Sequence, residues 1–340
     1  MAELSDYTSL RVGGPAKKFI EVSSEQEIIA AIEGAGDSPI LIMGAGTNML
    51  VSDDGFAGTV IRISNNKIEA EVDACSGATL TIGAGENWDE FVKTTISRGF
   101  AGLETLSGIP GTVGAAPIQN IGAYGHEVSE FITRVRTYDR QVKALKTFTN
   151  QECEFSYRNS HFKAHPGRYV VLDVAFQLRI GEVTTPITYS ELASALGISV
   201  GEKSSVVKCR EKVLELRSRK GMLLSESDHD SWSAGSFFTN PIISAEVAAQ
   251  LPADAPRWPQ TDGRVKTSAA WLIEHSGITK GQSIGGARIS TKHVLALTNS
   301  GEAKASDIAA LAKLAQEKVK ATFNIFLEPE VNLVGLNLCK

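Results

Sequence analysis

The sequence predicts an α+β fold with more than one domain. Its 340 residues exceed what one hydrophobic core usually holds, so about two or three domains are expected. Segments with helical spacing of apolar residues alternate with short apolar runs that are typical of strands. A polar segment at 221–232, GMLLSESDHDSW, then separates this pattern from a smaller α/β part.

In the first part, a strand-like segment at 16–22 is followed by a helix that begins after Ser24. Glu27 stands three residues later, as in a capping box, and Gly34 can end the helix. The apolar run at 39–43 predicts a buried strand. The same patterns predict helices from Asn87 to Gly99, around 197–220, at 268–277 and at 306–323 with Ser306 as N-cap, strands at 134–139 and 169–180, and an extended tail at 324–336.

Composition excludes several classes of function. The net charge of −5 argues against a nucleic-acid or anionic-membrane partner, because no large basic surface is evident. Cys75, Cys153, Cys209 and Cys339 show no paired spacing, so we expect reduced thiols rather than a metal site or disulfides. The first residues do not resemble a secretory leader, and we expect a cytoplasmic protein without a membrane span.

The most unusual stretch is LSGIPGTVGAAPIQNIGAYG at 106–125. It carries five glycines and no charged side chain. Glycine turns can aim successive backbone N–H groups at an anion, and the apolar residues Ile109, Val113, Ile118 and Ile121 can form a wall for a ring. The stretch therefore predicts a site for a flavin dinucleotide. A loop that packs tightly for structural reasons alone is the alternative.

Two shorter glycine turns, GAGTN at 44–48 and GAGEN at 83–87, follow predicted strands. Neither has the third glycine of a Rossmann fingerprint, and the first is not followed by a helix. We therefore expect a dinucleotide-binding fold of another kind.

Three residues are candidates for catalysis. Glu330 lies in an apolar tail, where a carboxylate is costly unless it is paired or functional, although an edge-strand position facing water is equally compatible. Arg158 lies between aromatic residues and could bind a carboxylate, or its stem could pack on a neighbouring ring. Ser236, in AGSFF, could be a shielded proton donor or a turn cap.

Two further cations and one aromatic residue also have both a structural and a ligand-binding interpretation. Arg217 and Lys220 close a predicted helix, where cations meet the helix dipole, but they could also hold a diphosphate. Tyr189 could lie at the edge of a core or act as a lid. Nothing in the sequence supports a serine hydrolase or a metalloenzyme.

Six motifs together resemble the UDP-N-acetylenolpyruvoylglucosamine reductase family from about Thr8 onward: GAGTNML, GAGENW, SGIPGTVGAAPIQNIGAYG, YRNS, AGSFFTNP and LEPEV. The resemblance implies two FAD-binding subdomains of the vanillyl-alcohol oxidase (PCMH) type and a C-terminal α/β substrate-binding domain. The boundaries expected are 1–66 and 67–214 for the subdomains, 215–323 for the substrate domain, and 324–340 for a tail that returns to the active site.

The resemblance also implies a reaction and its partners. NADPH and FAD would reduce the enolpyruvyl group of UDP-N-acetylglucosamine enolpyruvate to UDP-N-acetylmuramate, a step of peptidoglycan precursor synthesis. An FAD-dependent sugar or alcohol oxidase of the same fold, and a noncatalytic flavin-binding or nucleotide-sugar-binding protein, are the rival readings. A monomer is expected.

The resemblance assigns roles to residues of this sequence. Ser236 would protonate the substrate carbon, while Arg158 and Glu330 would bind and polarise the enolpyruvyl carboxylate. Substrate contacts fall on Tyr189, Arg217, Lys220 and Asn240. The expected cofactor contacts are Gly44, Ala45, Gly46, Thr47, Asn48, Gly108, Ile109, Pro110, Gly111, Thr112, Gly114, Ala115, Asn120, Ile121, Gly122, Ala123, Tyr124 and Gly125.

Two positions refine this comparison. Relatives that attach FAD covalently often have histidine where this chain has Thr47, so noncovalent FAD is expected. The family segment KGxQIGG occurs here as KGQSIGG at 280–286, with the glutamine shifted by one place. No substrate contact is therefore assigned to Gln282.

Overall fold

The computed structural model describes residues 1–73 and 77–338. Cys75 and Cys339, which the sequence predicts to be reduced, lie outside the described residues. The chain forms two compact units: the first unit comprises Met1, Lys17–Ala45 and Ala57–Leu223, and the second comprises Ala2–Ala16, Gly46–Phe56 and Leu224–Lys340. Beyond the first residues, the chain passes between them after Ala16, inside the first glycine turn after Ala45, after Phe56, and inside the polar segment after Leu223. The three domain boundaries expected from the sequence stay a prediction.

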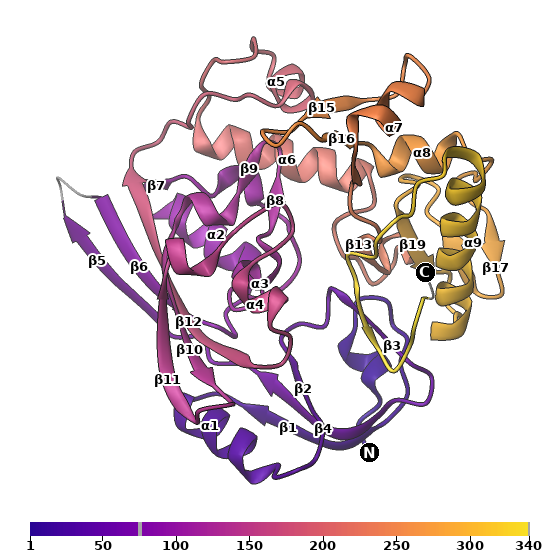
Figure 1. The fold of residues 1–340 in the computed structure, drawn as a ribbon. Helices are drawn as coiled ribbons and strands as arrows, with labels where there is room; N and C mark the ends of the chain where they lie inside the picture. The colour runs from indigo at the N-terminus through magenta and orange to yellow at the C-terminus, as the bar shows by residue number, and fades with distance from the viewer. Residues whose placement is uncertain (74–76, 339–340) are drawn as a thin grey trace. The chain divides into compact units, whose positions relative to one another are not determined.

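The first unit is built on two sheets (Figure 1). One has the order β1-β4-β2, with β1 at Ala16–Val22, β4 at Phe56–Ile63 and β2 at Ile40–Met43. The other has the order β11-β10-β12-β6-β5, with β7 paired to β12. Its strands are β11 (Ala144–Thr149), β10 (Ile132–Asp139), β12 (Tyr169–Ile180), β6 (Gly77–Gly83), β5 (Ile68–Asp73) and β7 (Phe100–Ala101).

The central strand β12 is antiparallel to both β10 and β6. Val174 faces Val135 on one side and Ile82 on the other, and all three side chains are buried. The apolar run of β12 therefore packs in the middle of a sheet, which confirms the strands predicted at 134–139 and 169–180.

Two helices of the first unit, α1 and α2, begin where the sequence predicts. Ser24 accepts a hydrogen bond from the Glu27 N–H and the reciprocal bond is present, so α1 (Glu25–Gly34) has the predicted capping box. Asn87 caps α2 (Trp88–Ser97) through the Glu90 N–H. The remaining helices of this unit are η2 (Glu104–Leu106), α3 (Ala116–Gln119), η3 (Val128–Glu130), η4 (Gln151–Cys153), α4 (His161–Ala164), α5 (Ser190–Leu196) and α6 (Val206–Arg219).

The helix predicted around 197–220 begins later than expected. Gly197 has a left-handed conformation that ends α5, and α6 starts at Val206. The four residues of its predicted apolar stripe are all buried, namely Val206, Cys209, Val213 and Leu216. The periodicity therefore gave the correct face, whereas the glycine that separates two helices was not recognised as a boundary.

The second unit combines short sheets with one long helix. Its main sheet has the order β13-β19-β18-β17, a second has the order β14-β16-β15, and β20 pairs with β3 in parallel. The elements are η1 (Leu4–Tyr7), β3 (Met49–Val51), η5 (His229–Ser231), β13 (Ser233–Ser236), β14 (Ile242–Ile243), α7 (Ala245–Gln250), β15 (Arg257–Pro259), β16 (Val265–Thr267), α8 (Ala269–Glu274), β17 (Ser283–Ile284), β18 (Ala287–Ile289), β19 (Ala296–Asn299), α9 (Ala305–Phe323) and β20 (Asn332–Val334).

The long helix α9 buries its predicted stripe, but Ser306 is not its N-cap. The helix starts at Ala305, and Asp53 from another part of the unit serves its N-terminus instead. The Asp53 carboxylate accepts hydrogen bonds from the N–H groups of Ala305 and Ser306 at 2.7 and 3.0 Å. A long-range acceptor of this kind has no signature near the helix in the sequence.

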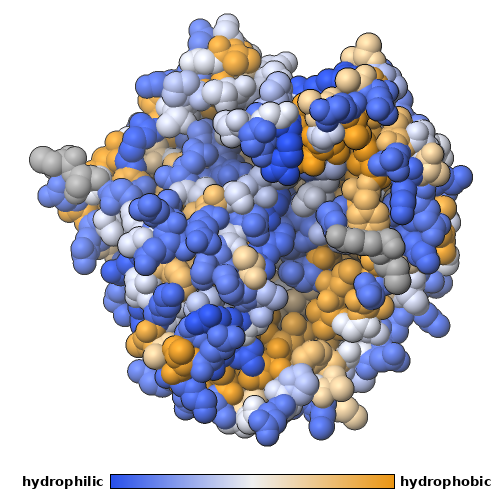
Figure 2. Space-filling model, in the orientation of Figure 1, coloured by the Kyte–Doolittle hydropathy of each residue, from blue (hydrophilic) through white to orange (hydrophobic). Residues whose placement is uncertain are grey.

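Hydrophilic residues cover most of the face shown in Figure 2. Within residues 1–73 and 77–338, no helix is both long enough and apolar enough to cross a bilayer.

Candidate active site

The glycine-rich stretch is fixed to the loop between β6 and α2 of the first unit. Val113 and Gly114 donate backbone hydrogen bonds to the carbonyls of Glu86 and Ala84, at 2.9 and 2.8 Å. A Cβ at Gly114 would lie 2.5 Å from the Ala84 Cβ, so only glycine allows this approach. The stretch is therefore a rigidly held loop, with its own hairpin of β8 (Gly122–Ala123) and β9 (His126–Glu127).

Several backbone positions in the stretch are left-handed. Gly108, Gly111 and Gly125 have φ values of 71°, 139° and 91°. Asn120 and Tyr124 are also left-handed, with φ of 43° and 49°, although they carry side chains. Such residues cost of order 1 kcal/mol or more and cluster at functional sites. Sequence inspection found the glycines but could not find the two non-glycine positions.

The predicted apolar wall needs one correction. Val113 is fully buried in the hydrophobic core of the first unit, so it does not offer a surface to a ligand. Ile109, Ile118 and Ile121 are half-buried and pack against that core. These three isoleucines, not four apolar residues, are available to contact a ring. The sequence could not show that Val113 is buried. In an irregular loop, apolar residues follow no fixed spacing that would separate buried from exposed positions.

Arg158 is held against the glycine-rich stretch. Its Nη1 and Nη2 donate hydrogen bonds to the carbonyls of Asn120 and Gly122, at 3.2 and 2.7 Å. Its backbone has φ of 53°, which is strained for a residue with a side chain. The structure therefore places this arginine with the predicted cofactor loop. The packing on a neighbouring ring, which the sequence offered as the alternative, is present too, since the guanidinium lies 5.4 Å from the Tyr157 ring centroid.

Tyr189 lies beside the end of the same stretch. Its ring meets that of Tyr124 edge to face with centroids 5.5 Å apart, and its side chain is 43% exposed. Burial raises the pKa of Tyr124 to about 12, so its phenol is neutral at physiological pH. A Cβ at Gly125 would lie 2.9 Å from the Thr188 Oγ1. The loop before α5 is thus seated on the glycine-rich stretch.

The two helix-end cations make protein contacts. Arg217 donates to the carbonyl of Gly108 at 3.0 Å and to that of Met222 at 3.1 Å, and burial lowers the pKa of its guanidinium. Lys220 pairs with Glu191 of α5 at 2.6 Å. Arg217 therefore has the structural role that its helix-end position suggests, and it also touches the glycine-rich stretch.

The first glycine turn is shared between the units. Gly44 and Ala45 follow β2 in the first unit, where a Cβ at Gly44 would lie 2.4 Å from the Thr112 Oγ1. Gly46, Thr47 and Asn48 belong to the second unit. There, Ser9 donates its N–H to the carbonyl of Gly46 at 3.2 Å and its hydroxyl to that of Thr47 at 3.3 Å.

Ser236 ends β13 at a β-bulge in the second unit. Ser233 faces Thr298 of β19 and Ser236 faces Ala296, so β13 has one extra residue between the two pairs. Gly235 takes the left-handed conformation, with φ of 74°, that such a bulge uses. The bulge re-aims the half-buried Ser236 side chain, while Phe237 and Phe238 after it are buried.

Replacing Gly235 by alanine should test the role of the bulge. A Cβ there would meet nothing within 4 Å, so the expected cost is backbone strain of about 1 kcal/mol. We expect the rate of the reduction that the sequence resemblance implies to fall by about 10²-fold, because small misplacements of a reacting group are costly. Gly263→Ala is the control, since Gly263 also has φ of 82° and open space. Equal rate losses in both variants would exclude a role for the bulge.

The tail that carries Glu330 runs beside the serine segment. The Glu330 N–H donates to the carbonyl of Phe237 at 2.8 Å, and Thr239 donates to that of Glu328 at 3.1 Å. The Asn48 side chain donates to the Glu330 carbonyl at 3.4 Å. Glu330 is half-buried. The second unit therefore brings Ser236, Glu330 and Asn48 onto neighbouring segments, while Arg158 belongs to the first unit.

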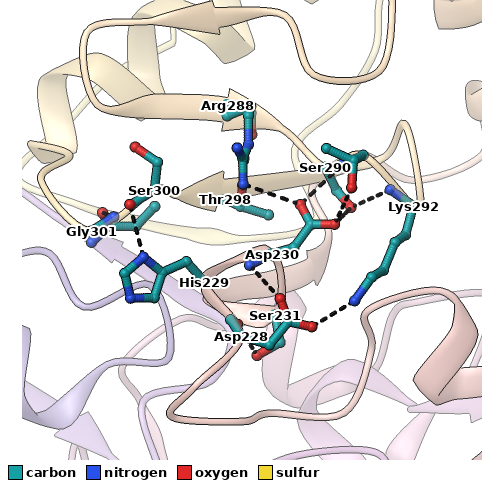
Figure 3. A network of polar contacts seen from close by, with 12 residues as sticks. Asp228, His229, Asp230, Ser231, Arg288, Ser290, Lys292, Thr298, Ser300 and Gly301 are labelled. Atoms are coloured by element: carbon teal, nitrogen blue, oxygen red, sulfur yellow. Dashed lines mark hydrogen bonds and ion pairs between the residues drawn. The ribbon is translucent and has the colours of Figure 1, made fainter.

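A polar network supports the sheet that carries Ser236 (Figure 3). Asp230 is 5% exposed and accepts hydrogen bonds from the Ser290 hydroxyl, the Thr291 N–H and the Thr291 hydroxyl. Its carboxylate points towards Arg288 of β18, at 3.8 Å. The network joins η5 to the β18–β19 hairpin, next to β13. Sequence analysis did not identify Asp230, because its partners lie about sixty residues away.

The remaining predicted residues have identifiable backbone roles. The Asn240 Oδ1 accepts the Ala269 N–H at 2.9 Å and so caps α8 from a distance. Gln282 accepts the Thr279 N–H at 3.3 Å, which is a local turn contact.

Comparisons with known proteins identify the family. Residues 227–334 match the family described as UDP-N-acetylenolpyruvoylglucosamine reductase, C-terminal domain, and residues 16–147 match the FAD binding domain family. The chain is 48% identical to UDP-N-acetylenolpyruvoylglucosamine reductase of Cutibacterium acnes, over 98% of this chain and 90% of the relative. The chain belongs to the UDP-N-acetylenolpyruvoylglucosamine reductase family. The resemblance seen in the sequence motifs is therefore confirmed.

Two further relatives support this assignment. The reductase of Streptomyces avermitilis is 49% identical over 99% of this chain and 95% of the relative. The crystal structure of the Thermus caldophilus enzyme matches with a TM-score of 0.67 and 26% identity, over 98% of this chain and 97% of that chain. The predicted α+β class, with an FAD-binding domain followed by a C-terminal domain of this family, is confirmed.

The residues of the first unit fit a flavin cofactor. From Thr105 to Gly125 there is no carboxylate to repel a diphosphate, and three half-buried isoleucines offer apolar surface. Left-handed Gly111 turns the backbone where N–H groups can face an anion. The donor set therefore suits a ligand with a diphosphate and a fused ring.

Proposed function

We propose that the chain reduces the enolpyruvyl group of UDP-N-acetylglucosamine enolpyruvate to give UDP-N-acetylmuramate, with NADPH as the reductant. The observation that carries this proposal is the 48% identity to a curated reductase over 98% of the chain. The step belongs to peptidoglycan precursor synthesis and so serves cell-wall formation, cell shape and division. We place the protein in the cytoplasm as a monomer.

FAD is proposed to bind noncovalently along the glycine-rich stretch and the turn at 44–48, where Thr47 replaces the histidine of covalent relatives. The bound cofactor would supply hydride transfer between NADPH and the substrate. The chain contributes apolar contacts from Ile109 and Ile121, and backbone N–H groups around Gly111 and Gly122. These residues bind and orient the cofactor but do not themselves carry electrons.

Arg158 and Glu330 are proposed to act on the substrate carboxylate. Adding hydride to the enol ether places negative charge on the carbon next to that carboxylate, and delocalises it onto the carboxylate oxygens. A guanidinium held in fixed orientation stabilises such charge more than water does. The bonds from Arg158 to the carbonyls of Asn120 and Gly122 support this role, because they fix the orientation of its planar guanidinium group.

Ser236 is proposed to donate the proton that completes the reduction. The Oγ–H bond breaks, and the proton goes to the carbon that becomes the lactyl α-carbon. An alkoxide at Oγ must then recover a proton from solvent or a neighbouring acid. A hydroxyl is a weak acid, so the donor must lie close to a strongly basic carbon. The bulge at Gly235, which sets the direction of Ser236, supports this placement.

Tyr189, Arg217, Lys220 and Asn240 are proposed to hold the UDP-sugar. The exposed ring of Tyr189 and the paired Lys220 and Glu191 lie on neighbouring positions around the start of α5. Arg217 would contribute through charge near Gly108, since its Nε is bound to that carbonyl.

Anaerobic absorbance measurements test the function. The purified protein should be yellow, lose its visible absorbance on addition of NADPH, and regain it only when the enolpyruvyl sugar nucleotide is added. An oxidase of the same fold would instead consume oxygen with a sugar or alcohol and without NADPH. A noncatalytic flavin protein would show no recovery with the sugar nucleotide. Either of these results would contradict the proposed reaction.

A further inference from the structure

An ion pair beside the glycine-rich stretch has no role in the proposed chemistry. Asp89 in the first turn of α2 and Arg210 of α6 pair in a two-pronged geometry, with Nη1–Oδ1 at 2.6 Å and Nη2–Oδ2 at 2.7 Å. Their side chains are 29% and 14% exposed. Two parallel hydrogen bonds between a guanidinium and a carboxylate give an ion pair strength and a defined geometry. The pair therefore holds α2 and α6 in a defined relation.

Asp89 also binds the backbone of the stretch itself. Its Oδ1 accepts the Gly108 N–H at 2.5 Å, and the carbonyl of Gly108 accepts from the Arg217 Nε at 3.0 Å. A Cβ at Gly108 would lie 2.7 Å from the Cδ2 atoms of both Leu214 and Leu223. The residue is thus held through its N–H and its carbonyl, and leucine side chains lie against its Cα.

The residue before Asp89 makes two more such bonds. The Trp88 N–H donates to the carbonyl of Gly111 at 3.1 Å, and its indole Nε1 donates to that of Leu106 at 2.9 Å. Trp88 is fully buried. The first two residues of α2 therefore fix three backbone points at the entrance of the stretch, at positions 106, 108 and 111.

We propose that Asp89 and Arg210 are positioning residues for FAD, which hold the backbone from Leu106 to Gly111 in the conformation that binds the cofactor. The inference rests on the cofactor role proposed above for this stretch. A loop that is already fixed loses less entropy when the ligand binds, so its affinity is higher. Arg210 contributes by keeping the Asp89 carboxylate in place and ionised.

The charge state of Asp89 agrees with this geometry. Burial by itself raises the pKa of the carboxyl, but the hydrogen bonds from Arg210 and the Gly108 N–H, with the nearby Arg217 charge, bring it below the ordinary value. A charged acceptor forms a stronger bond to a backbone N–H than a neutral one.

The alternative is that the pair only stabilises the first unit. Asp139 and Arg168 provide a matched control within the same unit, because Asp139 is 1% exposed and Arg168 binds it at 2.8 Å. That carboxylate accepts from the Gln141 N–H, not from the glycine-rich stretch. Loss of the control pair should therefore affect folding without affecting the cofactor.

The test is FAD titration of the apo-protein by flavin fluorescence quenching, with urea unfolding of the same apo samples. Asp89→Asn and Arg210→Gln should each raise the FAD dissociation constant about tenfold or more, the loss expected for a charge-assisted hydrogen bond. The FAD dissociation constant of the double variant should be no higher than that of the single variant that binds FAD more weakly, because the pair acts as a unit. Asp139→Asn should lower the urea midpoint and leave the dissociation constant unchanged. An unchanged constant in Asp89→Asn would overturn the inference.

Two further variants separate this inference from the proposed function. Ile109→Glu puts a carboxylate into the stretch itself and should weaken FAD binding if the stretch contacts the cofactor. Weakening in Ile109→Glu but not in Asp89→Asn would reject the positioning role alone. No weakening in either would reject the cofactor role of the stretch as well. If Arg210→Gln does not fold, Arg210→Lys keeps the charge and should show a smaller rise in the dissociation constant than Asp89→Asn.

Discussion

Ser236→Ala should slow the reduction of the enolpyruvyl sugar by about 10²- to 10⁴-fold, the range expected when a positioned proton donor is removed. The reaction with NADPH should keep its normal rate, because it needs no proton from this hydroxyl. Stopped-flow absorbance resolves the two halves of the cycle and so measures both rates in one protein. The serine is half-buried at a bulge beside buried Phe237, so water is a poor substitute for it as donor.

The control for this variant is Ser276→Ala. Ser276 is 8% exposed in the same unit, and its hydroxyl donates to the Ile273 carbonyl at 2.8 Å. Its loss should cost about 1 kcal/mol of stability and leave both rates unchanged. If Ser236→Ala lowered both rates together, or lowered neither, Ser236 would not be the proton donor.

The order of helices and strands could be predicted because their signals are local. The capping box of Ser24 and Glu27, the helix start at Asn87 and the four-residue stripe of α6 all lie within a few turns of chain, and the structure contains each of them. The assignment of Ser306 as the N-cap of α9 was wrong for the opposite reason, because the acceptor Asp53 comes from far away in the sequence. Local pattern cannot report an acceptor supplied by tertiary structure.

The candidate site shows the same difference between features with a local signal in the sequence and features that depend on distant residues. The glycines, Arg158, Ser236 and Glu330 stand out in the sequence because their neighbours are unusual for a solvated surface. Val113 was wrongly assigned to the apolar wall, since burial in an irregular loop depends on packing and not on period. Asp89, Asp230 and the left-handed Arg158 backbone were not found at all. An ordinary aspartate at a helix start has many possible uses, and only its partners reveal which applies.

Arg158→Gly should slow reduction of the enolpyruvyl sugar by about 10²- to 10³-fold, as when one oriented donor is lost from a developing charge. The variant should remain within about 1 kcal/mol of the parent in stability, because glycine relieves the left-handed backbone while the two bonds to Asn120 and Gly122 are lost. FAD should still bind at saturating concentration, and the rate with NADPH, measured with FAD saturating, should be unchanged. Arg158→Lys should recover only part of the rate, since an ammonium lacks the planar fork.

A substitution at Lys143 separates this effect from relief of strain. Lys143 has φ of 53°, like Arg158, and lies exposed in the turn between β10 and β11. Lys143→Gly should therefore change stability by a similar small amount and leave every rate unchanged. If Arg158→Gly instead lost FAD, or slowed the NADPH reaction as much as the reduction of the sugar, the arginine would serve the glycine-rich loop rather than the substrate. The comparison of FAD binding with the two rates separates these roles, because the same two bonds both hold the loop and orient the guanidinium.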